Sequence, residues 1–148
     1  DMLFGEIIDG NMRLSDFGAI ADECWRDVPE HFPNVDLGAY VIMPNHVHVL
    51  IDPAEPISKT VQCWKSLTAR WMLAHNERLE LRISNPHRVW MREYWDRFIR
   101  DDRHLWAALH YIHRNPVKAG LCCEPCDWKW SSARSADGRA DAPRRHDE

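Results

Sequence analysis

The stretch Val41-Ile-Met-Pro-Asn-His-Val-His-Val-Leu-Ile51 decides the fold, because it joins two apolar segments through a break at Pro44-Asn45. Residues 35–43 have the composition of a strand, and residues 46–51 resume as a second, densely apolar strand that ends at Asp52-Pro53. A connection this short is typical of neighbouring antiparallel strands. We therefore expect two antiparallel strands at the centre of the protein.

A hairpin and a helix are predicted ahead of this stretch. Residues 3–8 predict a short strand, an Asp-Gly-Asn turn signal follows, and residues 12–14 predict the returning strand. Ser15 or Asp16 is then placed to cap a helix, whose apolar residues recur at helical spacing before Pro29.

Helical and strand-like segments alternate after the central strands. A helix is predicted from residue 57 or 58 to about residue 76 to 79, and residues 89–100 form a strand-like mixture of aromatic and basic side chains. A further helix begins at residue 101 or 102 and is expected to end near Asn115, because Pro116 follows.

The last part of the chain divides into a packed segment and a tail. Residues 122–132 contain Trp128 and Trp130 and are expected to pack back on the core, whereas the residues after them are small, polar and charged. We predict one domain over residues 1–132 and a flexible polar tail over residues 133–148. Strands interleaved with helices predict an α+β fold, with helices against one face of an antiparallel sheet.

Length and composition are those of one folded domain without a membrane span. The chain has 148 residues, and its apolar runs are far shorter than the roughly 18 residues of a spanning helix. Its first residues do not resemble a signal peptide, and its 5 cysteines form no disulfide framework, so we expect a cytoplasmic protein. Cys123-x-x-Cys126 resembles half of a zinc site, but no second pair follows it.

The overall charge of −4 conceals a strong asymmetry along the chain. Residues 1–56 carry 2 basic and 11 acidic side chains, residues 59–118 carry 12 and 6, and residues 119–148 carry 5 and 6. The basic middle segment is suited to contacts with a phosphate backbone. Solvated helix faces explain the same charges, and charge alone favours that simpler explanation.

His46-Val47-His48 is a candidate metal-binding pair. On a strand, residues two apart point to the same face, so both imidazoles converge while Val47 points to the other face. Imidazole nitrogen suits several divalent metals, and a mixed nitrogen and oxygen site suits Mg²⁺ or Mn²⁺ beside a phosphate. By itself the pair is a weak signal, because two histidines on an exposed strand face are more often structural.

Tyr111 and Asn115 lie four residues apart on the last predicted helix and so share a face. A phenol needs assistance to act as a nucleophile, such as a metal that polarises the phosphate under attack. The alternative is a core tyrosine and a helix-ending asparagine. Tyr94, which lies among arginines, is a competing nucleophile, and spacing does not decide between the two tyrosines. His110 and His113 project to other faces and are interpreted as surface or packing residues.

Four ordered blocks together resemble one family. They are Val41 to Ile51, Trp90-x-Arg-Glu-Tyr-Trp-Asp-Arg-x-Ile-Arg100, Tyr111-Ile-His-Arg-Asn-Pro-Val-Lys-Ala-Gly-Leu121 and Asp127-Trp-x-Trp-Ser-Ser132. The chain resembles the REP-associated tyrosine transposases, which are single-tyrosine HUH (His-hydrophobic-His) transposases of the insertion-sequence-200-like group. The resemblance implies a ferredoxin-like (RRM-like) antiparallel β-sheet with helices packed on one face and the HUH motif on a central strand.

The resemblance also implies a mechanism and a site. His46 and His48 would bind Mg²⁺ or Mn²⁺, with Asn115 completing the metal site. Tyr111 would attack a single-stranded DNA phosphate, form a 5′-phosphotyrosine link and free a 3′-hydroxyl. Family members recognise DNA hairpins beside single-stranded guide sequences, and the expected DNA contacts are Lys65, Arg92, Arg97 and Arg100.

One departure from the family leaves alternatives open. Relatives usually have an additional N-terminal strand of the Tyr-Phe-Val-Thr type ahead of Leu3, which would lie beside the HUH strand. Without it, the chain is either an active strand transferase or a DNA-hairpin-binding module that has lost turnover. A third hypothesis, a metal hydrolase that uses a metal-bound water, predicts that Tyr111 is dispensable. The sequence does not distinguish a monomer from a homodimer.

Overall fold

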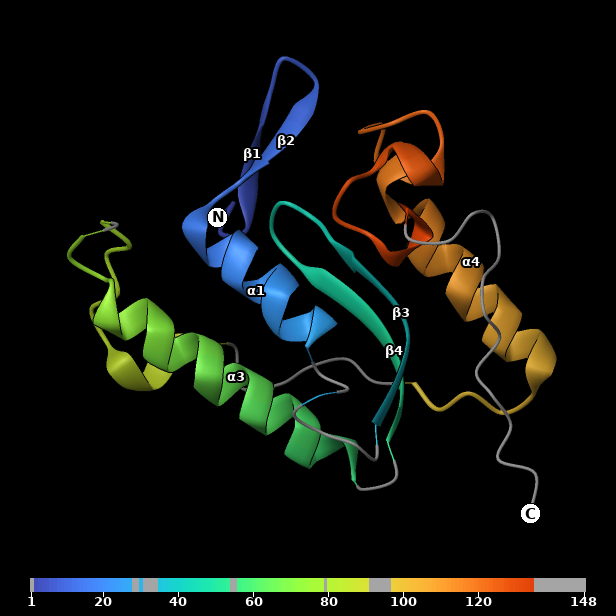
Figure 1. Cartoon of the computed structure of the whole chain (residues 1–148), viewed down its shortest axis with the longest axis horizontal. Helices are drawn as coiled ribbons and strands as arrows, with labels where there is room; N and C mark the ends of the chain where they lie inside the picture. Colours follow the sequence, from blue (N-terminus) through green and yellow to red (C-terminus); the bar gives the residue numbers. More distant parts are fainter. Residues whose placement is uncertain are drawn as a thin grey trace.

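The computed structural model describes residues 2–27, 30, 35–53, 56–78, 80–90 and 97–134, and these form the α+β fold expected from the sequence (Figure 1). The described strands make two antiparallel sheets of two strands each rather than one larger sheet. In chain order the elements are β1 (Gly5–Ile8), β2 (Asn11–Leu14), α1 (Asp16–Arg26), β3 (Val35–Ile42), β4 (Val47–Pro53), α3 (Ile57–Ala74), the 3₁₀ turn η1 (Pro86–Arg88), α4 (Asp102–Lys118) and the 3₁₀ turns η2 (Pro125–Asp127) and η3 (Ser132–Arg134).

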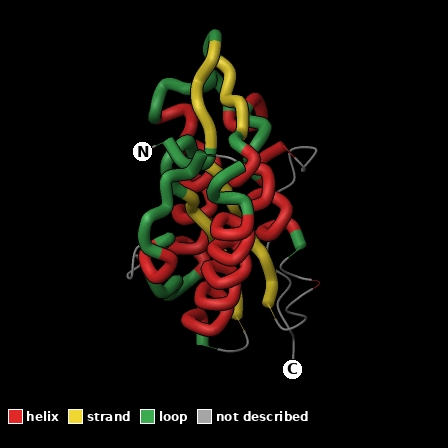
Figure 2. Tube along the Cα trace, turned by 90° about the vertical axis from the view of Figure 1, so that its left-hand side faces the viewer, coloured by secondary structure: helices red, strands yellow, loops and turns green. Residues whose placement is uncertain are grey.

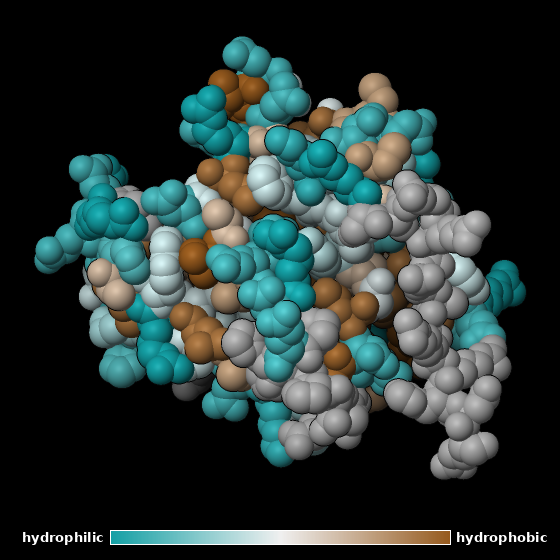
Figure 3. Space-filling view, in the orientation of Figure 1, coloured by the Kyte–Doolittle hydropathy of each residue, from teal (hydrophilic) through white to brown (hydrophobic). Residues whose placement is uncertain are grey.

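The predicted N-terminal hairpin is confirmed as β1 and β2. Asp9 and Gly10 connect the strands with φ angles of 50° and 77°, as a two-residue turn with positive φ at both positions requires. The hairpin projects beyond the helices in Figure 2. Apolar atoms lie on it in Figure 3, where Ile7 and Ile8 are partly exposed.

The β3–β4 pair forms the centre of the protein, as the sequence predicts. Its register places Tyr40 opposite Val49 and Val41 opposite His48. Because neighbouring cross-strand pairs face opposite sides of a sheet, Tyr40 points towards α1 and His48 points towards α4. Helices therefore lie on both sides of this sheet (Figure 1), and not on one face alone as the sequence analysis expected.

An aromatic cluster packs α1 against α3. Ring centroids are 5.3 Å apart for Phe4 and Phe17, 5.4 Å for Phe17 and Trp90, and 4.9 Å for both Trp90–Trp64 and Trp64–Trp25. Pairs at such distances contribute about 0.5–1.5 kcal/mol each beyond the area that they bury. Ser15 caps α1 as predicted, since its hydroxyl accepts a hydrogen bond from the Gly18 amide. None of the described helices is long and apolar enough to cross a membrane.

The segment after α4 packs back along the free edge of β3, as predicted. The Trp128 indole donates a hydrogen bond to the Ile42 carbonyl (2.9 Å), and the Ile42 amide donates to the Trp130 carbonyl (2.8 Å). Ser131 forms a bridge with Val41. The edge of β3 away from β4 is thus covered by backbone and side chains from the end of the described chain.

Two sequence predictions around α4 need correction. The helix does not end near Asn115 but continues through Pro116 to Lys118. Pro116 removes one backbone donor, but its ring is fully buried, and the amides of Ala119 and Leu121 bond back to the carbonyls of Asn115 and Pro116. The strand-like stretch 89–100 is also different: residues 97–100 form no strand, and residues 91–96 lie outside the described part of the chain.

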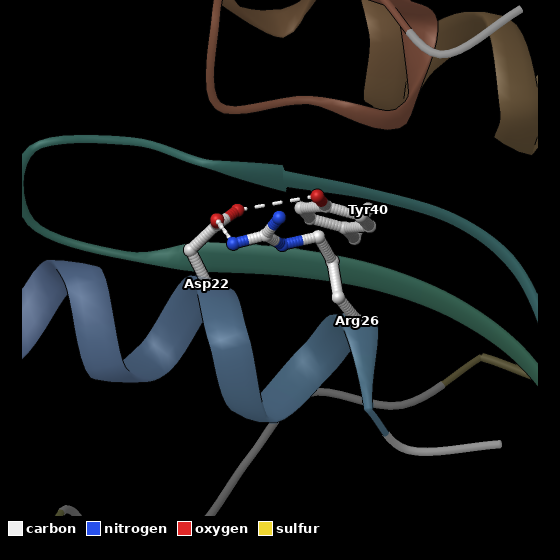
Figure 4. Close-up of polar contacts among 3 residues, drawn as sticks. All are labelled: Asp22, Arg26 and Tyr40. Carbon is white, nitrogen blue, oxygen red and sulfur yellow. Dashed lines mark hydrogen bonds and ion pairs between the residues drawn. The ribbon is translucent and has the colours of Figure 1, made fainter. Parts of the chain in front are cut away.

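A buried polar contact joins α1 to β3 (Figure 4). The Tyr40 hydroxyl donates a hydrogen bond to Asp22 Oδ1 (3.1 Å), and the Arg26 guanidinium lies 2.8 Å from Asp22 Oδ2. Burial raises the pKa of the Tyr40 hydroxyl, and the negative charge of Asp22 raises it further. Tyr40 therefore stays protonated and acts as the donor to a carboxylate that is itself buried.

We predict that Tyr40→Phe lowers the free energy of unfolding by about 1–3 kcal/mol, because it leaves one oxygen of a buried carboxylate without its donor. Urea denaturation followed by circular dichroism measures the change. Tyr111→Phe is the matched control: Tyr111 is 50% exposed, so its loss of the hydroxyl should change stability by less than about 0.5 kcal/mol. Equal stability of Tyr40→Phe and wild type would contradict the role given to this contact.

Candidate active site

The two histidines of the HxH motif stand together at the start of β4. The turn that carries them is closed by a hydrogen bond from the Met43 amide to the His46 carbonyl (2.8 Å) and is tied to the N-terminal segment through Phe4 and Pro44 (2.9 Å). The ring centroids of His46 and His48 are 4.8 Å apart and nearly perpendicular, with an interplanar angle of 83°. Both imidazoles thus lie on one side of the turn and strand, as their spacing predicts.

Helix α4 brings two further side chains to the same place. The Tyr111 ring lies 5.5 Å from the His48 ring, at 76° to it, and the Asn115 side chain is hydrogen-bonded to His46. The structure therefore gathers His46, His48, Tyr111 and Asn115 into one cluster. Tyr111 is 50% exposed, so its hydroxyl belongs to an accessible surface and not to the core.

The surroundings favour the neutral form of both histidines. Burial lowers the pKa of His46, an effect that its hydrogen bond to Asn115 opposes. Burial also lowers the pKa of His48, and the positive charge of a protonated His46 lowers it further. The Asn45 side-chain oxygen lies 2.7 Å from Nδ1 of His46, and in the neutral tautomer with the proton on Nδ1 that nitrogen donates to Asn45 while Nε2 carries the lone pair. Neutral imidazole is the form that ligates a metal.

Lys118 is a residue of this site that the sequence analysis missed. Its Nζ atom lies 5.9 Å from the centroid of the Tyr111 ring. The two residues are seven apart, two helical turns, and so share a face. Lys118 was not predicted to lie near Tyr111, because the helix was expected to end at Asn115. The two residues share a helix face only because α4 continues past Pro116.

The other candidate residues are scattered. Lys65 lies on α3, on the opposite side of the β3–β4 sheet from α4, where partial burial lowers its pKa. Arg97 and Arg100 precede α4 and are exposed, whereas Arg92 and the competing nucleophile Tyr94 lie outside the described residues. Among the expected DNA contacts that the structure describes, Arg97 and Arg100 lie next to α4, the helix that carries Tyr111, whereas Lys65 does not.

Ser132 links α4, the helix that carries Tyr111 and Asn115, to strand β3 through hydrogen bonds. Its hydroxyl oxygen accepts a hydrogen bond from the Tyr40 amide (3.0 Å) and lies 2.8 Å from Nε2 of His113. His113 is half-buried, in agreement with its interpretation as a packing residue, and His110 is exposed. The position of Tyr111 relative to His48 thus depends partly on the segment after α4.

Comparison with known protein families identifies the class to which the chain belongs. The model of the family described as "Transposase IS200 like" matches residues 21–115, which is more than half of the chain. These observations define the chain as a transposase, an enzyme class that acts on DNA. It belongs to the IS200-like transposase family.

Several relatives carry related names. A putative REP-associated tyrosine transposase of Haemophilus influenzae is 29% identical over 127 residues, covering 80% of this chain and 70% of the relative. The REP-associated tyrosine transposase of Escherichia coli is 24% identical over 97 residues, covering 66% and 53%. A solved structure of a REP-associated tyrosine transposase bound to a REP hairpin has the same fold, with a TM-score of 0.62 at 21% identity, covering 84% of this chain and 69% of that one.

We predict that Ser132→Ala weakens the attachment of α4. The change removes the acceptor of the Tyr40 amide and the partner of His113, so the free energy of unfolding should fall by about 1–3 kcal/mol. Backbone amides of α4 should also exchange with deuterium faster than in wild type. Ser58→Ala, an exposed serine in the first turn of α3, is the control and should leave both quantities unchanged. Unchanged exchange in α4 of Ser132→Ala would refute this role.

Proposed function

We propose that the chain is a metal-dependent strand transferase that cuts and rejoins single-stranded DNA at hairpin-flanked, REP-like sites, with Tyr111 as the nucleophile. The observation that carries the proposal is the position of the exposed Tyr111 ring, 5.5 Å from His48, beside a second histidine bonded to Asn115. A tyrosine that only packs in the core would be buried, and an ordinary surface tyrosine would have no reason to lie beside two histidines and an asparagine.

The donor atoms fit a divalent metal. His46, His48 and Asn115 supply two imidazole nitrogens and one carboxamide oxygen, a mixed set with an open side that suits Mn²⁺ or Mg²⁺ when a phosphate provides further oxygens. The described residues contain no group of three His, Cys, Asp or Glu side chains suited to a metal, so the proposed set depends on the Asn115 carboxamide as its third donor. When bound, such a metal supplies polarisation of the scissile phosphate.

The chain's own residues would carry the remaining steps. The Tyr111 oxygen forms a bond to phosphorus while the bond from phosphorus to the 3′-oxygen breaks, which leaves a 5′-phosphotyrosine and a 3′-hydroxyl after protonation. Lys118 Nζ lies 5.9 Å from the centroid of the Tyr111 ring, so it places a positive charge beside the position that the scissile phosphate would occupy. The reverse reaction, with another 3′-hydroxyl, rejoins the strand and restores the phenol, so no hydrolytic water is consumed.

The DNA partner is inferred from charge and from the relatives. Arg97 and Arg100 lie on the approach to α4, and the related solved structure is bound to a REP hairpin. We assign these two arginines to the phosphate backbone of the substrate. Lys65, on the opposite side of the sheet, would contact only DNA that wraps around the domain, and Arg92 remains a prediction from the sequence.

A second candidate function is a DNA-hairpin-binding module without turnover. It is favoured by the edge of β4, which is paired only with β3 among the described strands. No other described strand pairs with the free edge of β4, the strand that carries His48, and a strand held on one side only would position metal ligands poorly.

We predict that wild-type protein with Mn²⁺ or Mg²⁺ forms a covalent adduct with single-stranded hairpin DNA and that Tyr111→Phe forms none. On a denaturing gel the 3′-labelled fragment should migrate with the protein, while the 5′-labelled fragment is released. His110→Ala, an exposed neighbour on another side of α4, is the control and should react like wild type. DNA binding without any adduct in the wild type would favour the binding module.

Metal removal gives a further prediction. A chelator should abolish adduct formation and added Mn²⁺ should restore it, whereas Asn115→Ala should lower the adduct rate by about 10-fold or more at limiting Mn²⁺. The metal hydrolase hypothesis makes the opposite prediction for Tyr111, because a metal-bound water would continue to cut DNA in Tyr111→Phe. Chelator-resistant adduct formation would contradict the assignment of His46 and His48 as metal ligands.

A further inference from the structure

A groove of about 450 Å³ lies where the chain enters α4. It is lined by Arg97, Phe98, Arg100 and His104. Its walls are held by the start of the helix, since the His104 amide donates to Asp101 Oδ1 (2.7 Å) and the Arg100 amide donates to Nδ1 of His104 (3.3 Å). In Figure 1 this segment is the yellow-orange trace that runs into the lower end of α4.

Phe98 is the feature of this groove that the fold does not explain. Its side chain is 83% exposed, the highest value among the large apolar side chains that the structure describes. A phenyl ring in water contributes nothing to the core and is typical of a surface that binds something. Arg97 and Arg100, which line the same groove, form no ion pair with a carboxylate among the described residues, and they flank Phe98 in the sequence.

The groove is aligned with the candidate active site. His104 and Tyr111 are seven residues apart and Asn115 is four further on, so all three lie along one face of α4. The rise of an α-helix separates His104 from Tyr111 by roughly 10 Å. The helix residues between them on this face are Ala107 and Ala108, whose side chains are small.

We infer that this groove binds an unpaired nucleotide of the DNA strand that Tyr111 attacks, with its base stacked on Phe98 and its phosphates held by Arg97 and Arg100. The inference rests on the proposed function and adds the place where the flanking strand is held. Aromatic rings beside cations are the usual platform for single-stranded nucleic acid. Bases in a duplex keep their faces stacked on each other, so the ligand is single-stranded and lies within a few nucleotides of the scissile phosphate.

A second copy of the chain fits this surface less well. A symmetric contact through Phe98 would bring Arg97 and Arg100 close to the same residues of the other copy. Like charges at an interface oppose association. The charge of the groove thus favours a polyanion over self-association.

Binding of a fluorescein-labelled oligothymidylate, measured by anisotropy at fixed salt, tests the inference. Phe98→Ala should weaken binding about 5-fold to 150-fold, whereas Phe98→Trp should restore it and Phe98→Leu should not, since only the tryptophan offers an aromatic face. Arg97→Ala and Arg100→Ala should each reduce the salt dependence of binding. Trp106→Ala is the matched control: Trp106 is 51% exposed but lies about 140° around α4 from Tyr111, and its loss should have no effect.

The outcomes separate this inference from the proposed function. If Phe98→Ala binds the oligonucleotide as tightly as wild type, the groove assignment is wrong even where the Tyr111 adduct still forms. If Phe98 governs binding but wild type forms no adduct, the groove stands and the strand transferase is refuted. A wild type that does not bind the oligothymidylate but forms the adduct with hairpin DNA also refutes the groove assignment and leaves the strand transferase standing. A dimer that Phe98→Ala dissociates, seen by size-exclusion chromatography, would reassign the ring to self-association.

Discussion

The register of β3 against β4 is the constraint on which the rest of the structure depends. Tyr40 and His48 occupy neighbouring cross-strand pairs, so the pleat sends them to opposite faces, one to Asp22 and the other to Tyr111. A slip of one residue would bring Tyr40 and His48 to the same face, so that either His48 would turn away from Tyr111 or Tyr40 would turn away from Asp22. The buried contact between α1 and β3 therefore fixes, through the register, the face on which the histidines meet α4.

The position of α4 relative to that face comes from the end of the described chain. Trp128 and Ser132 bond to β3, and Ser132 also reaches His113, between Tyr111 and Asn115. Since α4 is a single helix, one attachment sets the positions of Tyr111, Asn115 and Lys118 together. This arrangement explains why a site whose parts are separated by more than 60 residues along the sequence needs few contacts of its own.

Local sequence signals predicted the parts of the fold that local chemistry determines. The Asp-Gly turn, the Ser15 cap and the alternation around Val47 each specify their element within a few residues. The length of α4 was mispredicted, because the burial of Pro116 against distant residues outweighs the lost hydrogen bond. Charge counts could not locate Lys65 on the far side of the sheet, since composition carries no information about faces.

The site itself was predictable only in part for the same reason. Spacing along the sequence is enough to place His46 beside His48 and Tyr111 beside Asn115. The proximity of the two pairs depends on the tertiary structure; the family resemblance implied it, and the structure shows the contacts. The significance of Lys118 and Phe98 comes from their neighbours in the structure: Lys118 lies beside the Tyr111 ring, and Phe98 lines a groove together with Arg97 and Arg100. One face of α4 thereby carries Lys118, Asn115, Tyr111 and the groove in order along the helix, so a DNA strand bound as we propose would follow that face.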